Sequence, residues 1–101
     1  MTEAALQQMV IDLARWAGFL HYHTTDSRKS RPGFPDLTLV HTTTGRLIFI
    51  ELKSEKGKLR PEQDVWLQHL GVHHEVYLWR PAHWQSGLIR RVLTEGRQAV
   101  A

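Results

Sequence analysis

The sequence predicts one α/β domain in which helices and strands follow the order α-β-β-β-α-β-α. Three observations lead to this fold class. Apolar residues near the N-terminus recur every three to four positions, as in an amphipathic helix. Two short aliphatic runs in the middle of the chain flank a polar turn, as in a hairpin. Proline and glycine then delimit a helix, a strand and a further helix. Because the chain has 101 residues, we expect a single domain spanning residues 1–101.

The first helix is expected to begin after Thr2, whose hydroxyl can cap it, and to end before Gly18. The apolar face expected to pack on the core consists of Leu6, Met9, Val10, Leu13, Trp16 and Ala17. A first strand follows over Phe19–His23. A polar and basic loop then covers residues 24–33. One helix and one strand are thus predicted ahead of the central hairpin.

The central hairpin is predicted from two runs of aliphatic residues, 37–40 and 47–52, with a short polar turn between them. A turn centred directly after Thr43 places Leu37 opposite Ile50. In this register one face of the hairpin is entirely apolar. The next residues outward on the two strands then also face one another, and both are carboxylates.

Those carboxylates are Asp36 and Glu51, and Lys53 joins them because side chains two positions apart share a strand face. Leu52 points the other way, into the core. A turn centred one residue later pairs Asp36 with Lys53 and still keeps all three on one face. Because opposed carboxylates repel, the pair needs a compensating cation. Mg²⁺ prefers oxygen ligands, so the sequence predicts a magnesium site in which Mn²⁺ can substitute, and it indicates a nuclease.

Proline and glycine delimit the C-terminal elements. Pro61 opens a second helix and Gly71 ends it, whereas Gly87 is unfavourable inside the last helix. We expect a basic loop over residues 54–60, this second helix over 61–71, a fourth strand over 72–79, a last helix over 81–93 and a frayed tail over 94–101.

The amino-acid composition excludes several classes of protein. The sequence has no cysteine, which excludes disulfides and thiolate metal sites. It also has no long apolar stretch and no basic N-terminus followed by an apolar segment, so we expect neither a membrane span nor a secretory signal. The formal net charge of +3 permits a polyanionic partner without requiring one. A cytoplasmic enzyme fits this composition best.

Three segments resemble the motifs of a known nuclease family. They are 33–36 (GFPD), 51–53 (ELK) and 57–63 (GKLRPEQ), and Glu3 precedes them in the first helix. Together they look like the stand-alone VRR-NUC family, of phage and bacterial type, in the PD-(D/E)XK nuclease superfamily. The resemblance covers about residues 1–93 and implies a restriction-endonuclease-like core with a central mixed sheet flanked by helices. One departure is Arg60, where we expect a small hydroxyl residue capping the second helix.

The resemblance also implies roles for the residues of these motifs. Asp36 and Glu51, with the backbone carbonyl of Leu52, would hold the metal. Lys53 would orient or activate the attacking water, and Gln63 would support the site from the second helix. Glu3 matches the family's N-terminal acidic residue and is a further candidate metal ligand.

Two basic loops flank the expected site, an arrangement suited to gripping phosphates on either side of a cleaved bond. Their candidate DNA-binding residues are Arg28, Lys29, Arg31, Lys56, Lys58 and Arg60. By resemblance, stand-alone members act as homodimers similar to Holliday-junction resolvases. We therefore expect a homodimer that cleaves branched DNA in a bacterial or phage-infected cell, with Mg²⁺ and without a small-molecule cofactor.

Each of these residues also has a purely structural interpretation. Asp36 suits a strand-entry turn, and Glu51 and Lys53 suit an exposed pair on an open sheet face. A carboxylate in a first helical turn, such as Glu3, favours the helix dipole without any metal. Gln63 could reach back to the chain at the start of its helix. Functional alternatives are a nonspecific nickase, an exonuclease, or a catalytically silent DNA-binding module.

Overall fold

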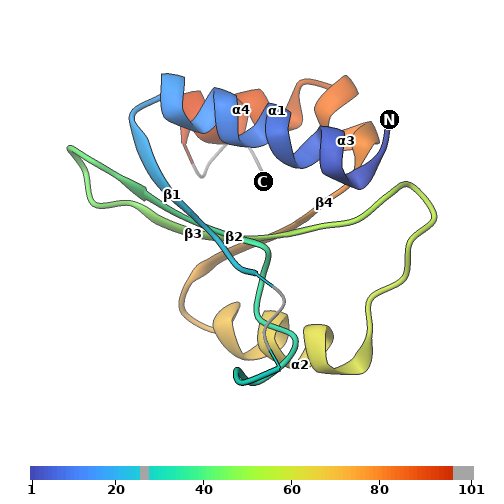
Figure 1. Ribbon diagram of the computed structural model, residues 1–101. Helices are drawn as coiled ribbons and strands as arrows, with labels where there is room; N and C mark the ends of the chain where they lie inside the picture. Colours follow the sequence, from blue (N-terminus) through green and yellow to red (C-terminus); the bar gives the residue numbers. More distant parts are fainter. Residues whose placement is uncertain (26–27, 97–101) are drawn as a thin grey trace.

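The computed structural model describes residues 1–25 and 28–96 and has the α/β fold predicted from the sequence. Its elements are α1 (Glu3–Trp16), β1 (Phe19–His23), β2 (Leu37–His41), β3 (Leu47–Leu52), α2 (Pro61–Leu70), β4 (Glu75–Trp79), α3 (Pro81–Gln85) and α4 (Leu88–Glu95). A central sheet separates two helical layers, with α1, α3 and α4 on one face and α2 on the other (Figure 1). Among the described residues, no helix is long and apolar enough to cross a membrane.

The four strands lie in the order β1-β2-β3-β4. The first three are antiparallel neighbours, and β4 pairs with β3 in parallel, so the sheet is mixed as expected. The predicted hairpin register is confirmed, because Leu37 pairs with Ile50 and Leu39 with Ile48. Gly45 in the turn has a φ of 72°, which lies in the left-handed region that glycine adopts without strain.

The hydrophobic core lies between the sheet and the layer of α1, α3 and α4. Alternate residues of β2 and β3 point into it, as the period of two requires. The buried apolar side chains are Leu6, Val10, Ile11, Ala14, Phe19, Leu37, Leu39, Ile48, Ile50, Leu52, Trp79, Ile89, Val92 and Leu93. The opposite face is covered only in part by α2, which leaves Leu20 and Tyr22 each 65% exposed.

The first helix begins as predicted, because the hydroxyl of Thr2 accepts a hydrogen bond from the amide of Ala5 at 3.0 Å. The assignment of Trp16 to the core face is wrong, since this side chain is 79% exposed. Trp16 lies two positions after the buried Ala14, about 200° around the helix. It therefore points away from the sheet although it extends an apolar pattern.

The C-terminal third differs from the expectation in its boundaries. The fourth strand begins at Glu75 and not at residue 72, because a turn after α2 occupies the intervening residues; in it the amide of His74 donates to the carbonyl of Leu70. The last helix is split in two at Gly87, whose φ is 82°. The second helix begins at Pro61 as predicted. Most of the predicted frayed tail, residues 97–101, lies outside the described residues, and α4 continues to Glu95.

Candidate active site

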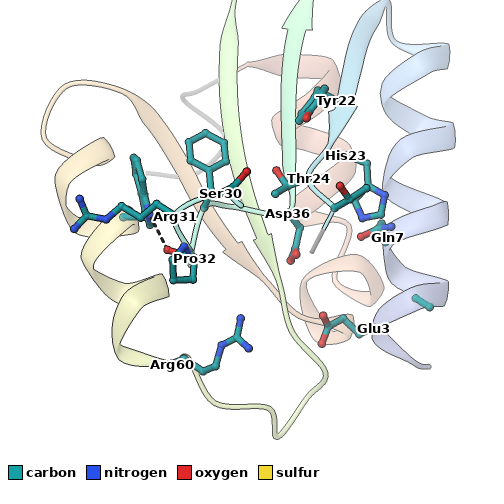
Figure 2. A pocket seen from close by; sticks show the side chains of 15 residues that line it. Glu3, Gln7, Tyr22, His23, Thr24, Ser30, Arg31, Pro32, Asp36 and Arg60 are labelled. Carbon is teal, nitrogen blue, oxygen red and sulfur yellow. Dashed lines mark hydrogen bonds between the residues drawn. The ribbon is translucent and has the colours of Figure 1, made fainter. Parts of the chain in front are cut away.

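A cleft of about 800 Å³ opens at the end of the sheet where β1 ends and β2 begins. The N-terminal turns of α1 form one side, with Glu3 and Gln7, and the loop before β2 forms the other, with Arg31 (Figure 2). Asp36 lies between these two sides. The structure therefore places the residue that opens β2 in a cleft large enough to admit part of a polymer.

Asp36 is held at the strand entry by its own backbone and side chain. Its carbonyl accepts a hydrogen bond from the amide of Thr24 at 2.8 Å, and the Thr24 hydroxyl donates to the carbonyl of Pro35 at 2.8 Å. The Asp36 Oδ2 atom accepts from the amide of Leu52 at 2.8 Å. Because three hydrogen bonds fix this segment, the carboxylate is preorganised beside β3.

Glu51 is only 1% exposed, and its two oxygens have different surroundings. Oε2 accepts a hydrogen bond from Nε2 of Gln63 at 3.1 Å. Oε1 is buried and has no hydrogen-bond partner. Gln63 is itself oriented, because its Oε1 accepts from the amide of Arg60 at 2.9 Å. The structure thus brings Gln63 to Glu51 as expected, and it leaves one buried carboxylate oxygen without a donor.

Lys53 completes the group on this face of the sheet. Its Nζ atom lies 3.9 Å from Oε2 of Glu51, and its side chain is 12% exposed. Its amide donates to the carbonyl of Trp79 at 3.1 Å, which extends the pairing of β3 with β4 beyond the assigned strands. The ammonium is therefore held close to the carboxylates by the sheet.

The electrostatics of the site are unbalanced in favour of negative charge. Burial, and after it the charge of the neighbouring Asp36 and a hydrogen bond with it, raise the pKa of Glu51 to about 8. The ammonium of Lys53 opposes this effect, and the charge of Glu3 adds to it. Two carboxyl groups thus share a site in which a single lysine does not compensate them.

The donor set fits a hard divalent cation. Carboxylate oxygens and a main-chain carbonyl are the ligands that Mg²⁺ accepts, and Mg²⁺ is usually bound by one or two carboxylates with water and substrate completing its shell. In the described part of the chain, no three His, Cys, Asp or Glu side chains form a group that could hold a metal ion. A metal at Asp36 and Glu51 would therefore depend on the Leu52 carbonyl and on oxygens from outside the protein. Glu3 lines the same cleft as Asp36.

The predicted DNA-binding residues divide into two groups. Arg31 and Arg60 line the cleft, and Arg60 also lies 3.3 Å from Glu62 in an exposed ion pair. The other four are exposed on the loops that flank the cleft but do not line it: Arg28, Lys29, Lys56 and Lys58. Arg31 and Arg60 thus bring one cation from each loop to the cleft.

The departure at Arg60 leaves the start of α2 unchanged. The helix begins at Pro61, and the amides of Gln63 and Asp64 donate to the carbonyl of Arg60 at 3.0 and 3.1 Å. The carbonyl of Arg60 thus accepts from the Gln63 amide that a hydroxyl cap would bind, and the side chain of Gln63 accepts from the amide of Arg60.

Two supporting residues were missed by the sequence analysis. Thr24 holds the entry to β2 from β1, and Arg80 binds the backbone of the loop after Lys53. Both act on residues at least eleven positions away, and neither belongs to a motif with a fixed spacing. The one feature of the sequence that could have indicated such a role is the position of Arg80 directly after the fourth strand.

Comparison with known proteins gives the following findings. The family profile of the VRR-NUC domain matches residues 2–93. A solved structure described as a VRR-NUC domain is similar to this one with a TM-score of 0.72 and 21% sequence identity, and the similarity covers 92% of this chain and 96% of that one. No curated protein matches the chain at a significant level.

Proposed function

Because the chain belongs to the VRR-NUC family of the PD-(D/E)XK nuclease superfamily, we propose that it is a metal-dependent DNA endonuclease. The family makes it a nuclease and hence a hydrolase acting on DNA. The proposal adds the metal, the roles of individual residues, the substrate and the oligomeric state.

The buried Oε1 atom of Glu51 carries the proposal for a metal. An unpartnered carboxylate oxygen inside a protein costs about 1–3 kcal/mol or more, so natural proteins rarely retain one without a function. Burial and the charge of the facing Asp36 both raise the pKa of Glu51, so the ionised pair lacks a compensating charge. A divalent cation between these groups would satisfy both.

Asp36, Glu51 and the main-chain carbonyl of Leu52 would hold Mg²⁺, with Mn²⁺ as a substitute. Glu3 is a candidate for a second metal position on the opposite wall of the cleft. When bound, Mg²⁺ supplies positive charge at the phosphate and lowers the pKa of water. The protein's contribution is a preorganised set of oxygens that the hydrogen bonds of Asp36 and Glu51 hold in place.

Lys53 and Gln63 both lie next to Oε2 of Glu51. The Lys53 ammonium, next to Glu51, orients the attacking water and stabilises the negative charge that develops on the phosphate. Gln63 fixes the orientation of the Glu51 carboxylate. The sequence has no cysteine to act as a covalent nucleophile, so direct attack by water is the simplest reaction.

The DNA backbone would lie along the cleft between the two basic loops. Arg31 and Arg60 are placed to contact the phosphates next to the scissile bond, because both line the cleft with Asp36. The remaining candidate cations, Arg28, Lys29, Lys56 and Lys58, would contact phosphates further along the strand.

Branched DNA, such as a Holliday junction, is our preferred substrate, and a homodimer our preferred assembly. The described fold is small and its elements form only the sheet and its helical layers, so a second copy is the simplest way to extend the basic surface. A two-fold dimer would also present two cleavage sites related by symmetry, as a four-way junction does. The finer alternatives are a nonspecific nickase, an exonuclease, and a DNA-binding module without activity.

The decisive experiment compares cleavage of duplex, flap, single-stranded and four-way-junction DNA in Mg²⁺, Mn²⁺ and EDTA. We expect cleavage only with a metal, and most rapidly on the four-way junction. Equal rates on all duplex substrates would favour the nonspecific nickase. Binding to DNA with no cleavage in either metal would favour the silent binding module.

The oligomeric state is tested by light scattering at micromolar concentration. We expect a mass twice that of the 11.7 kDa chain. A monomer mass together with intact junction cleavage would contradict the proposed dimer.

A further inference from the structure

The loop that connects Lys53 to α2, residues 54–60, is tied to the rest of the protein by one guanidinium group. Nη1 of Arg80 donates to the carbonyl of Ser54 at 2.6 Å, of Gly57 at 2.7 Å and of Glu55 at 3.2 Å. Arg80 directly follows β4, so it reaches the loop from a different strand. Hydrogen bonds with a charged donor are about twice as strong as neutral ones, so this group is well suited to fix the loop.

Further contacts hold the same loop at its start. The carboxylate of Glu55 accepts from the amide of Ala82 in the first turn of α3 at 3.1 Å. Within the loop, the amide of Gly57 donates to the carbonyl of Ser54 at 3.3 Å. The loop between β3 and α2 is therefore held against the start of α3, even though it runs over the surface (Figure 1).

Gly57 connects this turn to the active site. A Cβ atom added at Gly57 would lie 3.6 Å from Cδ of Lys53 and 2.8 Å from the hydroxyl of Ser54. The turn thus lies next to the aliphatic part of Lys53, at a separation that one methyl group would fill. The Lys53 side chain is 12% exposed, and its Nζ atom lies 3.9 Å from Glu51. Because the stem of the lysine is confined by the turn, the position of its ammonium depends on the bonds that Arg80 makes.

The same bonds orient the peptide groups of the loop. In a trans peptide the carbonyl and the next amide point in opposite directions, and the described residues contain no cis peptide bond. Since three carbonyls point at Arg80, the amides of Glu55, Lys56 and Lys58 point away from it. The outer side of the loop therefore presents amide hydrogens beside two lysine side chains, which suits contact with phosphate oxygens.

We propose that Arg80 is a positioning residue of the nuclease site, which shapes the loop 54–60 so that the loop confines Lys53 beside Glu51. This inference rests on the proposed function, because Lys53 matters only if the site cleaves a phosphodiester. Arg80 itself contacts neither the phosphate nor the metal ligands. Its substitution should therefore lower kcat and leave DNA affinity nearly unchanged.

Cleavage kinetics of Arg80→Ala and Arg80→Lys test this inference, with Arg90→Ala on the exposed face of α4 as a control that removes the same charge. We expect Arg80→Ala to lower kcat about 10–100-fold, the range that a misplacement of about 1 Å produces, with KM changed less than about threefold. Arg80→Lys should recover part of kcat, because an ammonium can donate to the same carbonyls. Arg90→Ala should behave as wild type.

Two measurements without turnover separate this role from the alternatives. Hydrogen exchange of the Gly57 amide should be faster in Arg80→Ala, whereas amides in the strands of the sheet should keep their protection. Binding to junction DNA in Ca²⁺ should be unchanged. A raised Kd with a shallower salt dependence would mean that Arg80 contacts phosphate directly, and it would overturn the inference.

A second variant covers the case in which Arg80→Ala fails to fold. Gly57→Val leaves Arg80 in place but adds methyl groups beyond a Cβ position that already lies 3.6 Å from Cδ of Lys53, so it should also lower kcat at constant KM. Wild-type kcat in both Gly57→Val and Arg80→Lys would overturn the inference while leaving the proposed function intact. Absence of cleavage by the wild type would instead overturn the proposed function, and the role of Arg80 with it.

Discussion

Two buried glutamates lie on neighbouring strands of the same sheet, and their surroundings are opposite. Glu75 begins β4 and is 6% exposed. Its Oε1 accepts from Nε of Arg46 at 2.8 Å, and its Oε2 accepts from Nη2 of Arg46 at 2.5 Å and from the hydroxyl of Tyr77. Arg46 also donates to the carbonyl of Val92 in α4 at 2.8 Å. Every charge in this cluster has a matching partner.

The hydrogen bonds of the Glu75 cluster explain its titration. The bond to Glu75 raises the pKa of Arg46, and burial followed by the bond to Glu75 raises the pKa of Tyr77. Both groups are therefore held in their ordinary protonation states at neutral pH. The cluster joins β3, β4 and α4, which is the role expected of a structural ion pair.

Glu51, on β3, is more deeply buried and yet incompletely bonded. It has an amide donor and a lysine at 3.9 Å on one oxygen and no partner on the other, and its pKa is raised to about 8. Burial does not distinguish the two glutamates, because both are buried. They differ in the number of hydrogen-bond donors around the carboxylate, and a carboxylate with too few donors is the one available to an external cation.

The largest effect on cleavage is expected from substitutions at the incompletely bonded site, at Glu51 and Lys53. Glu51→Gln and Lys53→Ala should abolish detectable cleavage in Mg²⁺, a loss of at least about 10²–10³-fold, since the first removes a charged metal ligand and the second removes the ammonium that stabilises charge on the phosphate. DNA binding should stay within a few-fold, because the basic loops supply the phosphate contacts. Turnover and filter binding on junction DNA measure both, with the exposed Glu95→Gln as control. Near wild-type turnover in either variant would refute the assignment.

Breaking the complete cluster should damage stability and spare the chemistry. Glu75→Ala leaves Arg46 and Tyr77 without their shared acceptor, so we expect a loss of about 3–5 kcal/mol, the range for a buried ion pair that loses one partner. The cleavage rate per folded molecule should not change. Urea denaturation of Glu75→Ala beside Glu95→Ala measures the loss. Equal stability of the two variants would show that the cluster has no structural role.

The raised pKa of Glu51 predicts that the stability of the protein depends on pH. Between about pH 4.5 and about pH 8 the folded protein holds a proton on Glu51 that the unfolded chain releases. Metal-free protein should therefore lose stability as pH rises through this window, by up to about 1.4 kcal/mol per pH unit. Below pH 4.5 and above pH 8 the contribution is constant. Thermal unfolding of wild type and Glu51→Gln in EDTA tests this, and parallel curves for both would contradict it.

The smallest effect concerns Asp36, which repels Glu51 across the strand pair. In EDTA above about pH 8, where Glu51 is ionised, Asp36→Asn should be more stable than wild type by about 0.2–1 kcal/mol, and its amide oxygen can still accept from the Leu52 amide. In saturating Mg²⁺ the difference in stability between the two proteins should shrink or change sign, because a metal that binds only the folded wild-type site stabilises the wild type. Melting curves with and without Mg²⁺ provide the test. If Asp36→Asn gains as much from Mg²⁺ as wild type, the metal is not held at Asp36.

Local patterns in the sequence were sufficient for the element order and the hairpin register. The period of two in β2 and β3 specifies which side chains point into the core, and a shift by one residue would expose all of them. The same parity places Glu51 and Lys53 on one face, whatever the exact turn. Pro61 and Gly71 bound α2 for equally local reasons, since one fixes φ at a helix start and the other follows the last turn.

Tertiary contacts determined what local patterns could not. Trp16 continues an apolar periodicity, yet the sheet covers only the stripe that includes Ala14, so Trp16 remains exposed. The sequence likewise contains no sign that Glu75 is fully bonded and Glu51 is not. Both are single glutamates in apolar runs, and their difference arises from Arg46 and Gln63, which reach them from 29 and 12 residues away.

The sequence by itself determined which charged residues share a strand face, because parity is a property of the backbone. Only the folded chain decided how many donors each carboxylate receives, because those donors come from elements that meet it only through packing.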